Sequence, residues 1–237
     1  MTFTLKTLPL ILLALFAVAT GATAAAQDLS AEEILDKLEE KAQATQDISA
    51  LVTGSLYDAD GTEIKLEVDT QFIAEEQLTR AEFYQPDALA DNFVVVDGDA
   101  VYNYLYVTNQ VTILNANDPD ALGSLFPEVQ EEVEGSFNAT PDVSRFFNGW
   151  EASVQGYGES PAGNAYTLRF DGVNEGPVDH VNAVIIDGEW LPHSLEFVQS
   201  DGKTLANLTF EDYNVDSGLD PEELRFIPPD AEVFDDR

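Results

Sequence analysis

Cysteine is absent from all 237 residues of the chain. This absence excludes disulfides, thiol nucleophiles, redox-active thiols and a lipid attached through an N-terminal cysteine. Histidine is scarce as well, with only His180 and His193, and we expect neither to act as a general base. The chain also lacks a G-x-S-x-G motif and a phosphate-binding loop. We therefore expect a binding protein without enzymatic activity, catalytic residues or a cofactor.

Positive charge is equally scarce. The chain has 10 Lys and Arg residues against 45 Asp and Glu residues, for a net charge of −35. Nucleic acid is excluded as a partner because phosphate contacts need a basic patch. The excess of acidic residues favours a surface adapted to solubility or to high salt. A specific cationic partner is the alternative interpretation.

The chain has one extended apolar run, at its N-terminus. Lys6 is followed by the apolar segment 8–18 and by small residues that offer cleavage after Ala24 or Ala26. A positive start, a short apolar core and small residues are typical of a secretory signal, and the run is short for a membrane span. We predict a signal peptide over 1–26, with an uncleaved anchor as the alternative. The protein is then periplasmic or otherwise extracytoplasmic, with a single domain over 27–237.

The mature part begins with a predicted amphipathic helix. Ser30 and Glu33 form a capping box, and Leu29 can pack against Ile34 across it. Apolar residues then recur at helical spacing and acidic residues occupy the remaining positions. Because the polar side is acidic, we expect this helix to pack on the domain's own sheet rather than on a membrane.

From residue 48 onward the apolar period changes to two, as β-strands require. Asp-Gly pairs at 60–61, 97–98, 187–188 and 201–202, together with Asn109-Gln110, predict tight hairpin turns. The sequence therefore predicts an antiparallel meander. Its strands are expected over 48–57, 62–73, 77–85, 92–97, 100–107, 110–115, 151–157, 164–171, 180–187, 193–199 and 203–214.

Residues 118–150 interrupt this meander. Asp118-Pro119 and Thr140-Pro141 each place a capping residue before a proline, which is typical of a helix start. We predict two short helices that lie over the open side of the sheet. The apolar residues of this expected lid are Leu122, Leu125, Phe126, Phe146 and Phe147.

The acidic turns raise the question of metal binding. The segment 58–63 resembles half of a calcium loop, but it lacks the third ligand and the glutamate that ends such a loop. We favour a solvated hairpin turn and predict no metal site.

A series of short motifs carries a family resemblance. In order, they are Gln85-Pro86-Asp87, the segment 92–98 ending in Asp97-Gly98, Val101-Tyr102-Asn103-Tyr104, Asn109-Gln110-Val111 and the segment 224–233 with its Pro228-Pro229. In this order and spacing, over nearly the whole mature chain, the sequence resembles the periplasmic lipoprotein carriers of the LolA/LolB superfamily, which also includes sigma-regulator sensor domains. The resemblance implies an α+β fold, with an incomplete, half-open antiparallel β-barrel around an apolar cavity, an N-terminal helix and a short two-helix lid.

The sequence departs from this family at one point. Certain carriers have an arginine-proline step whose arginine ties the lid shut, and the matching positions here are Glu75 and Glu76. The latch is therefore not carried over. Arg80 is the nearest basic residue on that strand, and we do not assign it this role.

The function implied by the resemblance is that of a soluble carrier or chaperone for acyl chains of lipoproteins or another lipid. We expect a monomer whose partners are lipid and, in addition, membrane-associated donor or acceptor proteins. Two alternatives remain, namely a sensor or interaction module of the same fold that regulates a membrane-bound partner, and a structural domain with a filled core. The residues expected to face the cavity are Ile64, Leu66, Val68, Phe72, Phe83, Tyr102, Tyr104 and Tyr106.

Overall fold

The computed structural model describes residues 29–58, 60–116, 149–172 and 178–237. The predicted signal peptide lies outside these ranges. So does the predicted lid with Leu122, Leu125, Phe126, Phe146 and Phe147.

One helix begins the described chain, and its start is as predicted. The side chain of Ser30 accepts a hydrogen bond from the backbone N–H of Glu33, whose carboxylate accepts one from the N–H of Ser30. This reciprocal capping satisfies two backbone donors that a helix start leaves unpaired. Ile34 and Leu38 on the apolar stripe are buried. The helix is α1 (Ala31–Ala44).

The strands agree with the prediction to within three residues at each end. They are β1 (Asp47–Tyr57), β2 (Glu63–Ile73), β3 (Leu78–Gln85), β4 (Phe93–Asp97), β5 (Ala100–Leu105), β6 (Gln110–Asn115), β7 (Glu151–Ser160), β8 (Gly163–Asp171), β9 (His180–Ile186), β10 (Pro192–Val198) and β11 (Thr204–Val215). Two further elements were not predicted, the helix α4 (Pro221–Leu224) and the strand β12 (Glu232–Asp235).

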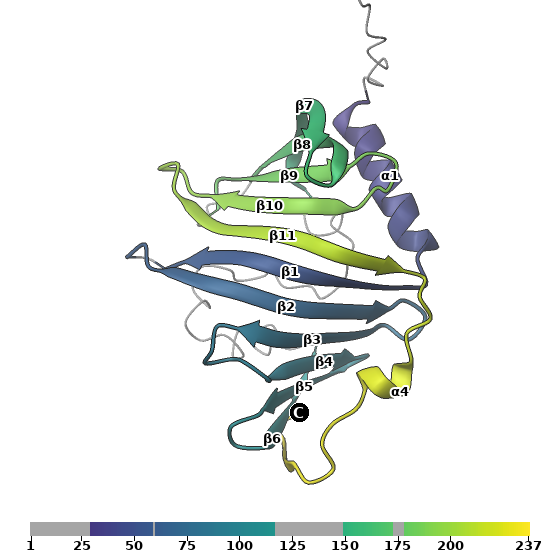
Figure 1. Cartoon of the computed structure of the whole chain (residues 1–237), viewed down its shortest axis with the longest axis vertical. Coiled ribbons are helices and arrows are strands. Elements are labelled where there is room, and N and C mark those ends of the chain that lie inside the picture. The colour runs from purple at the N-terminus through teal and green to yellow at the C-terminus, as the bar shows by residue number, and fades with distance from the viewer. Residues whose placement is uncertain (1–28, 59, 117–148, 173–177) are drawn as a thin grey trace, which may run out of the picture.

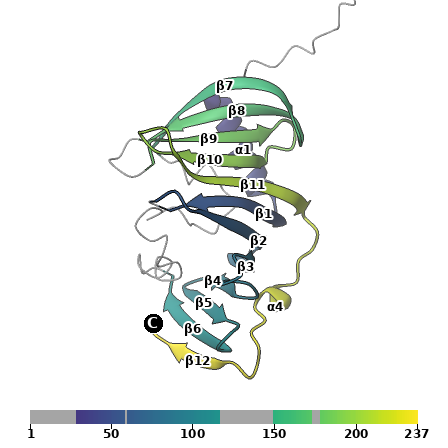
Figure 2. The ribbon, with the colours of Figure 1, turned by 60° about the vertical axis from the view of Figure 1, so that its left-hand side comes forward.

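All the strands form one sheet, with the order β12-β6-β5-β4-β3-β2-β1-β11-β10-β9-β8-β7. Neighbouring strands are antiparallel except β12, which pairs with β6 in parallel. The edge strands β7 and β12 lie at opposite ends of the molecule, so the sheet is not closed (Figures 1 and 2). The predicted half-open antiparallel architecture is confirmed. The Asp-Gly turns have the expected backbone as well, since Gly61 and Gly202 adopt φ of 85° and 83°, which favour glycine.

The sheet has apolar clusters on both of its faces. Side chains alternate along a strand, so the pairing register shows which residues share a face. On β8 to β11 the first cluster includes Tyr166, Leu168 and Phe170, and α1 packs on it. On β3 to β6 a second cluster includes Phe93 and Val95 and lies on the opposite face. We call the face under α1 the inner face and the other the outer face.

The outer cluster is covered by the C-terminal segment. Residues 216–237 follow β11, pass through α4, which contacts β3, and end in β12 beside β6 (Figure 2). Leu224 of α4 is 2% exposed and belongs to the outer cluster, and Leu219, Ile227 and Ala231 pack against that cluster. We call residues 216–237 the strap.

Candidate functional site

The inner face is apolar in the centre of the sheet. The register of β1 with β2 and β11 places alternate residues of these strands on the same side as the α1 cluster. None of these described inner positions carries a charge, although Glu63, Lys65, Glu67 and Asp69 of β2 point to the outer face. The inner positions are Ile48, Ala50, Val52, Gly54 and Leu56 on β1, Ile64, Leu66, Val68, Thr70 and Phe72 on β2, and Ala206, Leu208 and Phe210 on β11.

The depth of burial varies along this face. Beneath α1, Tyr166 and Phe170 are at most 2% exposed. A third cluster with Val68, Phe83 and Val94 lies further along the same face. Between these two clusters is a group of half-buried apolar side chains that we call the middle strip. It consists of Leu56, Ile64, Leu66, Phe72, Leu208 and Phe210. Leu56, Leu208 and Phe210 pack against the first cluster and Leu66 packs against the third, while Ala50 and Val52 beside them on β1 are buried.

Gly54 lies in the middle strip, between Leu66 on β2 and Leu208 on β11. A Cβ atom at this position would lie 2.0 Å from the backbone oxygen of Asn207, so the close approach of β1 and β11 requires glycine. Between Leu66 and Leu208, the backbones of β1 and β11 are therefore in direct contact.

Five of the eight residues predicted to face a cavity lie on the inner face. Ile64, Leu66 and Phe72 belong to the middle strip, and Val68 and Phe83 to the third cluster. Their expected role in lipid binding stays a prediction.

Tyr102, Tyr104 and Tyr106 do not join them, and their expected orientation is wrong. Tyr104 pairs with Phe93, and both belong to the outer cluster, where their rings stack at 4.6 Å between centroids. Tyr102 also packs against the outer cluster. Tyr106 lies beyond the end of β5 and is 56% exposed. On β5 the inner positions belong to Val101 and Asn103, and Tyr102 and Tyr104 occupy the outer positions.

The strap is fixed to the outer face by two arginines. Nη1 of Arg80 on β3 donates to the carbonyls of Leu224 at 3.3 Å and Phe226 at 3.0 Å, and its guanidinium lies 3.8 Å from the centre of the Phe93 ring. Burial lowers the pKa of Arg80. Because Arg80 points to the outer face, it cannot close a lid over the inner face.

Arg225 of the strap forms the second connection. Its Nε donates to Asp97 at 2.7 Å, and its Nη2 donates to Glu76 at 2.6 Å. The hydrogen bond to Asp97, and to a smaller extent the one to Glu76, raises the pKa of Arg225. Glu76, one of the two residues that stand where certain carriers have the latch, therefore holds the strap. No local pattern indicated these contacts, since they join residues about 130–150 positions apart.

The start of the strap is held by Asp47, the first residue of β1. Its carboxylate accepts hydrogen bonds from the N–H groups of Ser217 at 2.9 Å and Gly218 at 3.0 Å, and from the Ser217 hydroxyl at 3.0 Å. Burial acts to raise the pKa of Asp47, but the hydrogen bonds from Gly218 and Ser217 outweigh it and hold the pKa below its usual value.

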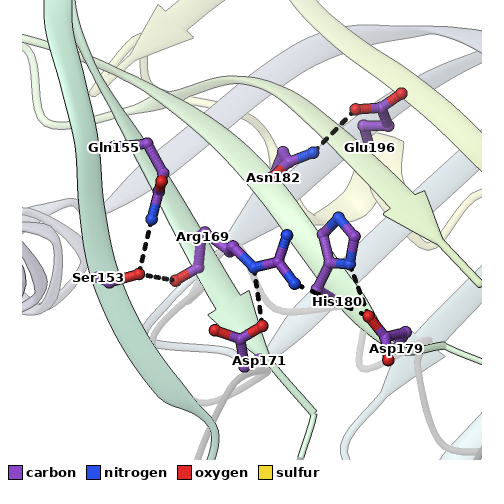
Figure 3. A network of polar contacts seen from close by, with 8 residues as sticks. All are labelled: Ser153, Gln155, Arg169, Asp171, Asp179, His180, Asn182 and Glu196. Carbon is purple, nitrogen blue, oxygen red and sulfur yellow. Dashed lines mark hydrogen bonds and ion pairs between the residues drawn. The ribbon is translucent and has the colours of Figure 1, made fainter. Parts of the chain in front are cut away.

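The outer face of β7 to β10 is polar, in contrast to the face beneath α1. Arg169 lies between Asp171 at 2.7 Å and Asp179 at 3.7 Å, and Nδ1 of His180 is 2.9 Å from the same Asp179 (Figure 3). Asn182 donates to Glu196 in the next strand at 3.0 Å. Opposite charges are paired here on a solvated surface, as on the outer side of many half-buried sheets.

The predicted metal-free turn at 58–63 uses its acidic groups locally. The N–H of Thr62 donates to Asp58 at 2.7 Å and to Asp60 at 3.0 Å. In the ranges that the structure describes, no three His, Asp or Glu side chains are placed to hold a metal ion. A cavity of about 20 Å³ lies at the C-terminal end of α1, between Leu38, Ile48 and Trp190. It has room for about one water molecule and not for an acyl chain.

Three solved structures illustrate the likeness to known proteins. An uncharacterized conserved protein from Thermus thermophilus matches with a TM-score of 0.62 and 23% identity, over 86% of this chain and 98% of that chain. MucB matches with a TM-score of 0.52 and 14% identity, over 86% of this chain and 65% of that chain. A LolA superfamily protein from Nitrosomonas europaea matches with a TM-score of 0.38 and 12% identity, over 82% and 97%.

The likeness to the Thermus thermophilus protein and to MucB shows a shared fold alone. No family model and no curated protein matches the sequence. Among the helices of the described ranges, none is long and apolar enough to cross a membrane.

Proposed function

We propose that this protein is an extracytoplasmic carrier that binds the acyl chain of a lipid or lipoprotein on the middle strip of its inner face. The observation that carries the proposal is the uncharged, half-buried strip on β11, β1 and β2. The chain has 45 acidic residues, yet the inner positions of these strands carry none of them. An apolar surface of this kind favours contact with an apolar ligand.

The energetics of such a site are favourable. Each buried methylene group contributes about 0.8 kcal/mol, so a long acyl chain along the strip gains several kcal/mol after ordering costs. The open half-barrel supports the proposal, because a curved sheet that does not close offers the concave surface on which small-molecule sites form.

Two substitutions on β11 test the proposal. Phe210 points to the inner face and its neighbour Thr209 to the outer face, where its cross-strand partners are Thr53 and Ser194. Phe210→Glu and Thr209→Glu therefore each add one carboxylate to the same strand, on opposite faces. We expect Phe210→Glu to weaken the uptake of a fluorescent fatty acid by about tenfold or more and Thr209→Glu to leave it unchanged.

Leu66→Glu repeats the test from β2, and circular dichroism establishes that each variant is folded. Equal uptake by the folded inner-face variants and by Thr209→Glu would contradict the proposed site. If the protein instead forms a stable complex with a membrane-bound partner and transfers no lipid, the sensor interpretation of the same fold replaces that of a carrier.

A further inference from the structure

The turn between β5 and β6 exposes three consecutive apolar side chains. Leu105 is 37% exposed, Tyr106 56% and Val107 88%. Removing apolar side chains from water lowers the free energy, so three exposed apolar neighbours are unusual on a protein surface. We call residues 105–108 the apolar tip.

The apolar tip is firmly built. The N–H of Tyr106 donates to the side chain of Asn92 at 2.8 Å, and the carbonyl of Tyr106 accepts from the N–H of Asn109 at 3.1 Å. The side chain of Asn109 accepts from the hydroxyl of Tyr104 at 3.1 Å and donates to the carbonyl of Asp230 at 3.2 Å. The backbone of Tyr106 is thus already satisfied by the protein, which is what entry into an apolar environment requires.

The surroundings of the apolar tip are acidic. Because the strands are antiparallel, the connections after β1, β3, β5 and β10 all lie at one end of the sheet (Figure 1). The turn after β1 contains Asp58 and Asp60, the connection after β3 contains Asp87 and Asp91, and the turn after β10 contains Asp201. The tip alone among these four connections has neither an acidic nor a basic residue.

We propose that the apolar tip docks the protein on an electrically neutral lipid surface. The tip is a projecting turn and not a groove, so it suits insertion into a soft layer better than it suits a folded partner. Tyr106 has the amphipathic ring that favours the interface between water and lipid, and Val107 is the most exposed large hydrophobic side chain in the described ranges. A net charge of −35 disfavours anionic lipid.

Docking through this tip would also orient the molecule. Leu56 and Ile64, the last inner-face pair before the turn after β1, belong to the middle strip and lie at the same end of the sheet as the tip. The inference goes beyond the acyl-binding proposal, because it depends on the tip and not on the strip.

The absence of cysteine allows a local test on the full chain. Thr108→Cys, labelled with an environment-sensitive nitrobenzoxadiazole dye, reports on the tip, and Ser200→Cys in the turn after β10 is the matched control at the same end. With phosphatidylcholine vesicles we expect a blue shift and a several-fold rise in emission at residue 108 and no change at residue 200. Adding Val107→Asp should raise the lipid concentration for half-maximal response by about tenfold or more.

The inference is overturned if the dye at residue 108 does not respond, if residue 200 responds equally, or if Val107→Asp changes nothing. Replacing part of the phosphatidylcholine by phosphatidylglycerol should weaken the response, and a stronger response would contradict the neutral-surface assignment. Uptake of a fluorescent fatty acid in solution, measured on the same variants, separates the two proposals. A silent tip with normal uptake removes only the docking site, whereas a responding tip without uptake removes only the acyl site.

Discussion

The two halves of the sheet are covered on opposite faces. On β8 to β11, α1 covers the inner face and the outer face is polar. On β3 to β6, the strap covers the outer face through Leu224 and its neighbours. The crossover falls at β1 and β2, where Ala50, Val52 and Val68 of the inner face are buried and the residues of the middle strip are half-buried. A single sheet can thus have two cores on opposite faces, with a half-buried apolar strip where they meet.

The two covers are also held in different ways. The helix α1 packs with a continuous apolar stripe, and its capping residues are its immediate neighbours in sequence. The strap is held chiefly through Asp47, Arg80 and Arg225, whose partners lie far away in the sequence. We therefore expect hydrophobic substitutions to act similarly in both halves, and substitutions of charged residues to act mainly on the strap.

The largest expected effect is on the two cores. Phe170 under α1 is 1% exposed and Phe93 under the strap is 5% exposed. Phe170→Ala and Phe93→Ala should each lower the free energy of unfolding by about 3–5 kcal/mol, because each leaves a cavity in a packed cluster. Chemical denaturation followed by circular dichroism and by tryptophan fluorescence measures this effect. Coincident transitions for both variants would indicate one cooperative domain, whereas two separate transitions would show that the halves unfold independently.

A smaller effect is expected for the arginines. Arg80→Met leaves two strap carbonyls without their donor and should lower the free energy of unfolding by about 2 kcal/mol. Arg169→Met, on the solvated outer face of the other half, removes a partly exposed ion pair and should cost at most about 1 kcal/mol. Limited proteolysis near the C-terminus should accelerate for Arg80→Met alone. Equal effects of the two variants would remove the distinction between the halves.

The smallest expected effect concerns pH and Asp47. Its pKa in the folded protein lies below that in the unfolded chain, so its ionised form stabilises the fold. This contribution is fully present above the unfolded value, about 4, and is lost as the pH falls through the folded value. Asp47→Asn should therefore be less stable than the wild type at pH 7, and the difference should narrow below about pH 4.

Denaturation at a series of pH values from 7 to 3 measures this difference. Tm values of the two proteins that stay equally far apart over the whole range would show that Asp47 does not act through its charge.

The sequence was sufficient for the elements with a regular period. The capping box at Ser30, the Asp-Gly turns and the alternation along β2 located α1 and β1 to β11. It was not sufficient for choosing the face of β5, because Val101 and Tyr102 are both apolar and only pairing with β4 decides between them. The strap has no regular hydrophobic period that would predict its position. Its contact with Arg80 joins residues 144 positions apart, which no local pattern indicates. Gly54 was missed because a glycine required by a close strand approach has no local signal.

The most direct test of the carrier proposal is native mass spectrometry of the protein purified without detergent from a lipid-replete host. We predict mass additions that match acyl lipids, disappear after organic extraction and are reduced in Phe210→Glu but not in Thr209→Glu. A clean mass for the wild-type protein, together with no uptake of a fluorescent fatty acid, would contradict the account and favour a structural domain with a filled core.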